Sequence, residues 1–375
     1  MSITAFHIID STLREGEQFA HAHFTPQQKL EIAAALDEFG ADYLELTSPV
    51  ASPQSEADLR LIATRPRRFR LLTHVRCNLD DARLAIDTGV DGVDVLIATS
   101  SQLRPVSHGL SVDEIIATGI AVVTEIRGRG LQVRFSTEDS FRSDPDDLVR
   151  VYRAIDRAGV DRVGLADTVG VATPRQVHEL VSLVRANVAC DIEFHAHDDT
   201  GCAVANALAA LEAGATHIDT TILGIGERNG IVPLSAMMAR LLTVQPDLVE
   251  RYRLDMLPEL DGMLAAILGV DIPFTAAVTA PNAFHHKAGM HTKAVIADPS
   301  AYEVLDPARF GRQRSILTGH RLSGRHAIRH RATTLGVELD DTHLRSLTAE
   351  VKRLGDRAPL DNDQLDALIR GWATA

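Results

Sequence analysis

Cysteine, basic charge and long apolar segments are all scarce in this chain of 375 residues. Its three cysteines, Cys77, Cys190 and Cys202, have unrelated spacings, which excludes a disulfide framework or a CxxC metal motif and favours a reducing compartment. A net charge of −13 argues against nucleic acid and anionic membrane surfaces as partners. No run of about 18 uncharged apolar residues occurs, and the N-terminus leads straight into a predicted strand. We therefore expect no membrane span and no signal peptide, and predict a cytoplasmic protein.

A dinucleotide-binding fingerprint is also missing, because the first predicted strand is followed by STLREGEQ rather than by GxGxxG. The chain has instead a repeat of short β-branched runs, each followed by an amphipathic stretch with apolar residues three or four positions apart. The predicted strands span residues 6–10, 43–47, 70–75, 92–97, 132–136, 162–166, 191–195 and 218–223.

Helix boundaries in this repeat have recognisable signals. The first predicted helix starts after Thr25, a capping residue followed by proline. Several helical stretches end at a glycine just before the next strand, as at Gly40, Gly89, Gly159 and Gly214. Eight such units in roughly 250 residues predict an α/β protein with a (β/α)8 TIM barrel, in preference to an open doubly wound sheet.

The region beyond the repeat has a different composition. We predict three parts: a catalytic barrel over residues 1–262, a linker and lid segment over 263–318, and a small helical C-terminal domain over 319–375. Residues 253–270 are expected to be helical. Residues 273–302 are rich in Gly, Pro and His and are expected to be irregular.

Polar residues occur at the ends of all eight predicted strands. A TIM barrel carries its chemistry on the loops at the carboxyl ends of the strands, so we expect these side chains to converge on one mouth. In strand order they are Arg14, Glu15 and Gln18; Glu45, Thr47 and Ser48; His74; Asp94; Arg134, Ser136 and Glu138; Asp167 and Thr168; His195 and His197; and Glu227. This mouth is the predicted active site.

His195 and His197 lie two positions apart at the end of a strand, so both imidazoles leave the same face. Such a pair supplies two ligands of a facial metal site, which a carboxylate would complete. Carboxylates are available in the segment DSTLREGEQ, residues 10–18. An HxH pair alone is equally typical of ordinary strand histidines, and the barrel pattern is what favours the metal site.

Arg14 and Arg134 would place two guanidiniums in one pocket, and guanidiniums bind carboxylates through paired hydrogen bonds. This favours a small dicarboxylate as substrate, although Arg134 has an alternative structural partner in Glu138. Asp10 is interpreted either as a site residue or as a buried polar group of the barrel. The segment GIGERNG, residues 224–230, is either a phosphate cradle or a tight turn that closes the barrel.

Three long motifs stand at the first, seventh and eighth strands: DSTLREGEQ, HAHDDTG and GIGERNG. They resemble those of the metal-dependent Claisen-condensing barrels, a superfamily that includes the homocitrate, isopropylmalate and citramalate synthases. Within it the chain is most similar to homocitrate synthases of the lysine-pathway type. The Arg-Glu pair of the first motif supports this, together with TSPVASPQS, RFSTEDSFRS, GLADTVGVATPRQV and FHHKAGMHTKA.

The resemblance implies condensation of acetyl-CoA with 2-oxoglutarate and thioester hydrolysis to homocitrate and CoA, the first step of lysine synthesis by the α-aminoadipate route. It implies a divalent cation, Mg²⁺ or Mn²⁺ before Zn²⁺ or Co²⁺, bound by Glu15, His195 and His197. The implied substrate-binding residues are Arg14, Gln18, His74, Asp94, Arg134, Ser136 and Thr168, and the implied catalytic residues are Arg14, Glu138, His291 and Tyr302.

The resemblance also implies a homodimer in which His291 and Tyr302 reach the partner's site from a lid, and lysine as a feedback inhibitor. One departure from the family pattern is Asp198, where Asn is usual after the second histidine. Isopropylmalate synthases often carry an Asn metal ligand where this chain has Ile231. Two alternatives stay open: an isopropylmalate or citramalate synthase using another 2-oxo acid, and an inactive paralogue that senses an amino acid.

Overall fold

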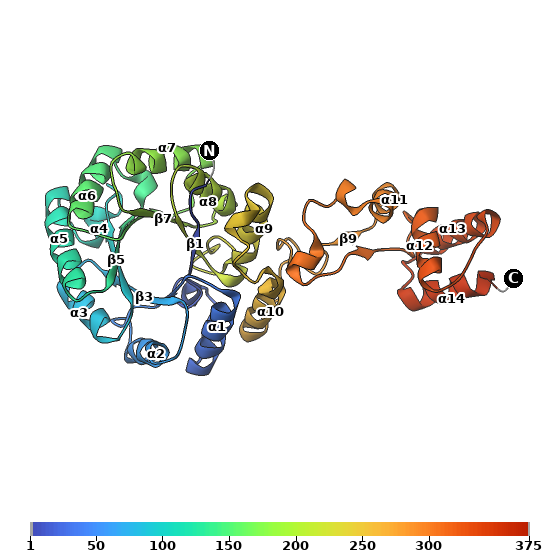
Figure 1. Ribbon diagram of the computed structural model, residues 1–375, viewed down its shortest axis with the longest axis horizontal. Helices are drawn as coiled ribbons and strands as arrows, with labels where there is room; N and C mark the ends of the chain where they lie inside the picture. Colours follow the sequence, from blue (N-terminus) through green and yellow to red (C-terminus); the bar gives the residue numbers. More distant parts are fainter. Residues whose placement is uncertain (1–2, 374–375) are drawn as a thin grey trace. The chain divides into compact units, whose positions relative to one another are not determined.

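A computed structural model describes residues 3–373 (Figure 1). Residues 1–2 of the predicted barrel and residues 374–375 of the predicted C-terminal domain lie outside the described residues. The chain divides into two compact units, Met1–Thr279 and Ala280–Ala375. The predicted three-part division, with boundaries after residues 262 and 318, stays a prediction. Within residues 3–373, no helix combines the length and the apolarity needed to cross a bilayer.

The first unit is built on one closed barrel of eight parallel strands, in which each strand pairs with the next and β8 pairs with β1. Figure 1 shows the helices forming a ring outside these strands. The strands are β1 (His7–Asp10), β2 (Tyr43–Leu46), β3 (Arg70–Arg76), β4 (Gly92–Ala98), β5 (Gln132–Glu138), β6 (Arg162–Asp167), β7 (Asp191–Ala196) and β8 (His217–Thr220). The predicted TIM barrel is confirmed, because an open doubly wound sheet has two unpaired edge strands.

The helices of the first unit follow the strands as predicted. They are α1 (Pro26–Phe39), α2 (Pro53–Ala63), α3 (Leu79–Asp87), α4 (Arg104–Ser107), α5 (Val112–Gly128), α6 (Pro145–Arg157), α7 (Pro174–Arg185), α8 (Ala203–Glu212), α9 (Leu234–Val244) and α10 (Leu257–Leu268). Thr25 caps α1 by accepting the N–H of Gln28. Gly40, which ends α1, has φ 97°, a conformation that glycine adopts without steric cost.

The predicted eighth strand, residues 218–223, is too long at its carboxyl end, because β8 stops at Thr220 and a 3-10 turn, Ile222–Gly224, follows. Leu223 has φ 58°, which cannot continue a strand. The backbone N–H of Ile222 donates to the Thr12 hydroxyl at 2.9 Å instead of to a neighbouring strand. The chain therefore turns early, and this turn brings the next loop over the barrel mouth.

The second unit contains a two-stranded sheet and four helices among its described residues. They are β9 (His285–His286), α11 (Gly289–Ala297), β10 (Ser315–Ile316), α12 (Arg325–Thr334), α13 (Asp341–Gly355) and α14 (Asn362–Ala373). The expectation that residues 273–302 are irregular is wrong for α11. Thr292 and Val295, three positions apart, are both buried, and this spacing supports a helix.

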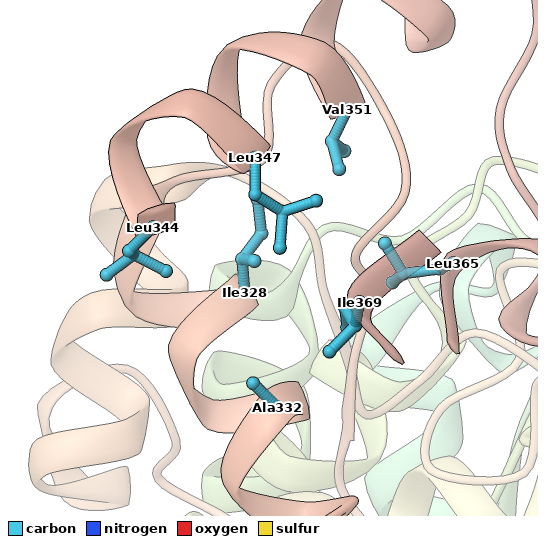
Figure 2. Close-up of a cluster of buried hydrophobic side chains, with 7 residues drawn as sticks. All are labelled: Ile328, Ala332, Leu344, Leu347, Val351, Leu365 and Ile369. Atoms are coloured by element: carbon cyan, nitrogen blue, oxygen red, sulfur yellow. The ribbon is translucent and has the colours of Figure 1, made fainter. Parts of the chain in front are cut away.

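The last three helices of the second unit surround their own apolar core. Figure 2 shows this cluster, which brings together Ile328, Ala332, Leu344, Leu347, Val351, Leu365 and Ile369. On α13 the buried residues recur at intervals of three and four, as expected of an amphipathic helix. The helical C-terminal region predicted from the sequence therefore has the buried apolar side chains that hold such a bundle together.

Candidate active site

A cavity of about 190 Å³ lies where the carboxyl ends of the barrel strands meet. It is lined by Arg14, Glu15, Gln18, His74, Leu96, Arg134, Ser136, Glu138, Ala166, Thr168, His195, His197, Glu227 and Arg228. Most of the residues predicted to converge on the mouth belong to this lining. The residues that lie outside it are Glu45, Thr47, Ser48, Asp94 and Asp167. The side chains converge because all eight strands are parallel, which brings their carboxyl ends to the same rim.

Glu15, His195 and His197 come together in this lining, with their ligand atoms all within 4.8 Å of one another. The two Nε2 atoms are 3.3 Å apart, and Nε2 of His195 lies 4.0 Å from Oε2 of Glu15. Ligands bound at about 2.1 Å and at right angles to one another lie ~3 Å apart around a cation. The three donors therefore fit a divalent cation bound on one face.

The orientation of two of these donors is fixed by neighbouring groups. Nδ1 of His195 bonds Oδ2 of Asp219 at 2.8 Å, which leaves Nε2 available to a cation. Glu15 accepts the backbone N–H of Glu227 at 2.9 Å through Oε1, and Nη1 of Arg14 at 2.5 Å through Oε2. The triad is thus preorganised by hydrogen bonds from β8, from the loop after it and from Arg14.

The protonation states also suit a cation. Burial opposes ionisation of Glu15, but the positive charge of Arg14 and the nearby imidazoles outweigh it and lower the pKa of the carboxyl. Burial, together with the neighbouring His195, lowers the pKa of His197 to about 4, so its imidazole is neutral near pH 7. Nδ1 of His197 is buried with no hydrogen-bond partner among the described residues. A carboxylate and a neutral imidazole are the forms that bind metal ions.

Arg14 and Arg134 both belong to a buried network of ion pairs beneath the cavity. Nε of Arg14 donates to Oε2 of Glu45 at 2.7 Å. Arg134, only 2% exposed, pairs with Glu193 on β7, and its guanidinium also lies 3.7 Å from Glu45. The partner of Arg134 is therefore Glu193 and not Glu138, the alternative raised from the sequence. Both arginine charges are already matched by carboxylates of the barrel.

Asp94 lies within β4 and is fully buried between two arginines, 3.5 Å from Arg134 and 3.8 Å from Arg162, so it is outside the cavity lining. Burial is the main cause that raises the pKa of Asp94 to about 7. Asp10 is fully buried too, and burial raises its pKa to about 7 although it accepts the N–H of Thr12. Asp10 is a polar group of the barrel interior, as one of the two interpretations held.

Hydroxyl and carboxyl groups complete the lining on β5 and after β6. The Thr168 hydroxyl accepts the backbone N–H of Asp139 at 2.9 Å, so its own proton is available to a ligand. The Ser136 hydroxyl donates to the carbonyl of Gly164 at 3.2 Å. Burial and the adjacent Asp139 raise the pKa of Glu138, as expected of a group that exchanges protons.

Comparison with known proteins identifies the family. A model described as HMGL-like matches residues 5–261, and one described as homocitrate synthase post-HMGL domain-like matches residues 278–359. A mitochondrial homocitrate synthase of Penicillium rubens is 52% identical over 372 residues, which cover 99% of this chain and 78% of the relative. The chain belongs to the homocitrate synthase family. This confirms the resemblance predicted from the motifs and shows an enzyme of the acyltransferase class.

Other relatives include a second homocitrate synthase at similar identity and a 2-isopropylmalate synthase at lower identity. The cytosolic homocitrate synthase isozyme of Saccharomyces cerevisiae is 50% identical, over 99% of this chain and 87% of the relative. A probable 2-isopropylmalate synthase of Methanopyrus kandleri is only 38% identical, over 93% and 70%. The crystal structure of hydroxymethylglutaryl-CoA lyase from Pseudomonas aeruginosa has a TM-score of 0.63 at 22% identity, over 72% of this chain and 96% of that one, and shares the barrel fold.

In this member of the homocitrate synthase family, His291 and Tyr302 lie in the second unit. Their ring centroids are 4.2 Å apart, and the Tyr302 side chain is 49% exposed. The next residue, Glu303, is held by Arg314 and by His286 at 2.7 Å, which fixes the segment that carries Tyr302. The catalytic roles predicted for His291 and Tyr302 stay predictions.

Asp198, the departure from the usual family pattern, does not line the cavity. Its Oδ1 accepts the N–H of Ala203 at 2.8 Å, where α8 begins. A negative charge is stabilised at the N-terminus of a helix. The Asp198 carboxylate therefore contacts the first N–H of α8 and does not line the cavity that holds the triad.

The charged residues at the site that sequence analysis missed are Glu193, Asp219 and Arg228. Glu193 precedes His195 by two positions on β7, so the same alternation that singled out the histidines could have found it. Asp219 belongs to no recognisable motif, and its contact with His195 follows only from the pairing of β7 with β8. Arg228 lies in GIGERNG, whose glycines permit close approach: a Cβ on Gly230 would lie 1.8 Å from the carbonyl of Gly224. The tight-turn interpretation of this segment accounts for that contact.

Proposed function

We propose that this protein condenses acetyl-CoA with 2-oxoglutarate in a metal-dependent reaction and hydrolyses the thioester to give homocitrate and CoA. The observation that carries the proposal is the triad of Glu15, His195 and His197 in a cavity that also presents carboxylate-binding donors. The homocitrate synthases that the chain matches at about half identity support the choice of reaction.

Glu15, His195 and His197 would hold the divalent cation, for which Mg²⁺ and Mn²⁺ are the first candidates. When bound, the cation would act as a Lewis acid that polarises the keto and carboxylate oxygens of a 2-oxo acid. Arg14 contacts both Glu15 and Glu45 and would donate to the oxygen on which negative charge develops. Its guanidinium is held rigidly by these carboxylates, so little reorganisation is needed when that charge appears.

The distal carboxylate of 2-oxoglutarate would lie against His74, Ser136 and Thr168, above Arg134. Thr168 is well suited because the N–H of Asp139 occupies its acceptor side and leaves its proton for the ligand. A 2-oxo acid without a distal carboxylate would leave the Thr168 hydroxyl and the His74 imidazole without a ligand partner, whereas the Ser136 proton is already donated to Gly164. A polar group left unpaired in a closed site costs about 1–3 kcal/mol. This favours 2-oxoglutarate over 2-oxoisovalerate or pyruvate.

Glu138 would exchange protons with the acetyl group or with the leaving thiol, together with His291 and Tyr302 from the lid of a partner subunit. The His291 and Tyr302 rings lie close together, and Tyr302 is exposed, which supports a pair that contacts another protein surface. We propose a homodimer with exchanged lids on this basis. Lysine inhibition and a cytoplasmic location stay predictions.

The decisive experiment measures CoA release from acetyl-CoA with Mg²⁺ or Mn²⁺ and one of four acids: 2-oxoglutarate, 2-oxoisovalerate, pyruvate or oxaloacetate. Strong preference for 2-oxoglutarate, abolished by a chelator, is the expected result. Preference for 2-oxoisovalerate or pyruvate would overturn the substrate assignment while leaving the metal site intact. Binding of a 2-oxo acid with no turnover of any of the four would favour the amino-acid sensor.

A further inference from the structure

The loop between β8 and α9, residues 221–233, touches the proposed metal ligand Glu15 directly. The backbone N–H of Glu227 donates to Oε1 of Glu15 at 2.9 Å. Gly226 lies so close that a Cβ there would be 2.9 Å from the same oxygen. The position of this loop therefore determines where one oxygen of Glu15 points, and hence which oxygen is left for a cation.

Arg228, which follows Glu227 in this loop, connects the loop to two other loops of the barrel mouth. Its Nε and Nη2 bond the two carboxylate oxygens of Asp199 at 2.7 and 2.8 Å. Nη2 also donates to the backbone carbonyl of Thr168 at 2.7 Å. One guanidinium thus joins the loops that follow β6, β7 and β8. Such a planar fork matches a carboxylate in a way that a lysine ammonium does not.

The backbone at Arg228 has a conformation that needs an external restraint. Arg228 has φ 56°, in the left-handed region that non-glycine residues adopt only at an energetic cost. The contacts with Asp199 and Thr168 hold it there. The Arg228 side chain is 40% exposed and lies at the rim, so the fold of the barrel does not depend on burying it.

We propose that Arg228 is a positioning residue for the metal site: through Asp199 and Thr168 it fixes the loop whose Glu227 N–H orients Glu15. This role rests on the proposed metal-dependent function. It concerns the affinity for the cation and does not require Arg228 to touch substrate. Its loss should loosen Glu15 first and leave His195, which Asp219 holds, in place.

The test replaces Arg228 by Asn, which adopts positive φ more readily than other residues and so removes the guanidinium without adding backbone strain. Asp199→Asn removes the partner, and a double variant completes the cycle. Arg253→Asn is the matched control, since Arg253 is 49% exposed and bonds Asp255 through two nitrogens away from the cavity. The Kd for Mn²⁺ is measured by electron paramagnetic resonance of the free ion, without substrate.

We expect Arg228→Asn to raise the Kd for Mn²⁺ roughly 10- to 100-fold, the usual effect of losing a group that orients a metal ligand. Asp199→Asn should raise the Kd by a similar factor. The double variant should have a Kd no higher than that of the single variant that binds Mn²⁺ less tightly. Arg253→Asn should leave the Kd unchanged. A Kd for Arg228→Asn within about twofold of the unmodified protein would overturn the role of Arg228 alone. Failure of the unmodified protein to bind Mn²⁺ would overturn the proposed function and this role together.

Discussion

Nδ1 of His195 on β7 lies 2.8 Å from Oδ2 of Asp219 on β8. The same carboxylate lies 3.6 Å from Arg134 and 3.8 Å from Arg14, so it connects the triad to the ion pairs beneath the cavity. A carboxylate bonded to the far nitrogen of a histidine fixes the tautomer and makes the near nitrogen a better ligand. Asp219 therefore orients a ligand of the proposed metal site without facing the cavity.

Asp219→Asn should weaken Mn²⁺ binding roughly 10- to 100-fold, because the neutral amide no longer favours a proton on Nδ1 of His195. Asp198→Asn is the control: it is the same change next to His197, at a residue whose contact is with the start of α8. Its Mn²⁺ affinity should stay as in the unmodified protein. Equal losses in the two variants, measured by paramagnetic resonance, would mean that net charge alone governs the site.

Removing the cation should abolish binding of 2-oxoglutarate. The guanidiniums of Arg14 and Arg134 are already matched by Glu45 and Glu193, so the cavity has little excess positive charge of its own. A divalent cation would supply the attraction for a dianion. Titration calorimetry with and without a chelator checks this. Tight binding in the presence of the chelator would show that the arginines alone hold the substrate.

Lys29→Met should destabilise the barrel by about 3 kcal/mol, because it leaves the buried carboxylate of Asp58 and the partly buried carboxylate of Glu17 without a cation. Nζ of Lys29 lies 2.6 Å from Glu17 and 2.7 Å from Asp58, and the lysine side chain is only 7% exposed. Urea denaturation followed by circular dichroism measures the effect. Arg175→Met, which breaks an exposed pair with Glu179, is the control and should cost no more than about 1 kcal/mol.

A triple variant separates loss of charge balance from loss of packing. Adding Glu17→Gln and Asp58→Asn to Lys29→Met replaces the two unpaired carboxylates by neutral amides of nearly the same shape. We expect this variant to recover more than half of the lost free energy of unfolding, since a network with no charges is better than one with unpaired charges. A triple variant less stable than Lys29→Met would show that the hydrogen bonds of this network matter more than its charges.

The pH profile of kcat/KM should have an acidic limb above the ordinary pKa of a glutamate. Burial and the charge of Asp139 raise the pKa of Glu138, with His108 opposing them, so the base form is lost as pH falls through that raised value. Asp139→Asn should move the limb to lower pH. Asn suits the φ of 62° at this position, so the backbone is kept.

The control for this profile is Asp146→Asn, an exposed change at the start of α6. It should leave the acidic limb in place. A limb that stays where it is in Asp139→Asn would mean that another group, such as a metal ligand, titrates there. Glu138→Gln should lose most turnover at every pH if Glu138 is the base.

The barrel was predictable because its signals are local. Alternating β-branched runs, the cap at Thr25 and the glycines at positive φ, such as Gly40 and Gly159, each depend on a few neighbouring residues. The end of β8 was not predictable in the same way. Leu223 is apolar and suits a strand, yet Asp261 receives its backbone N–H at 3.2 Å and Thr12 accepts that of Ile222, so distant contacts ended the strand.

Residue spacing alone determined that His195 and His197 share a face, and the motif DSTLREGEQ placed a carboxylate at the same mouth. Only the closed barrel decided what surrounds them. Asp219 is 24 positions from His195, and the Glu227 amide is 212 positions from Glu15. These groups meet because β8 pairs with β1 and β7 pairs with β8. Sequence periodicity indicates on which face of a strand a side chain lies, whereas closure of the barrel determines which residues from distant parts of the chain come into contact.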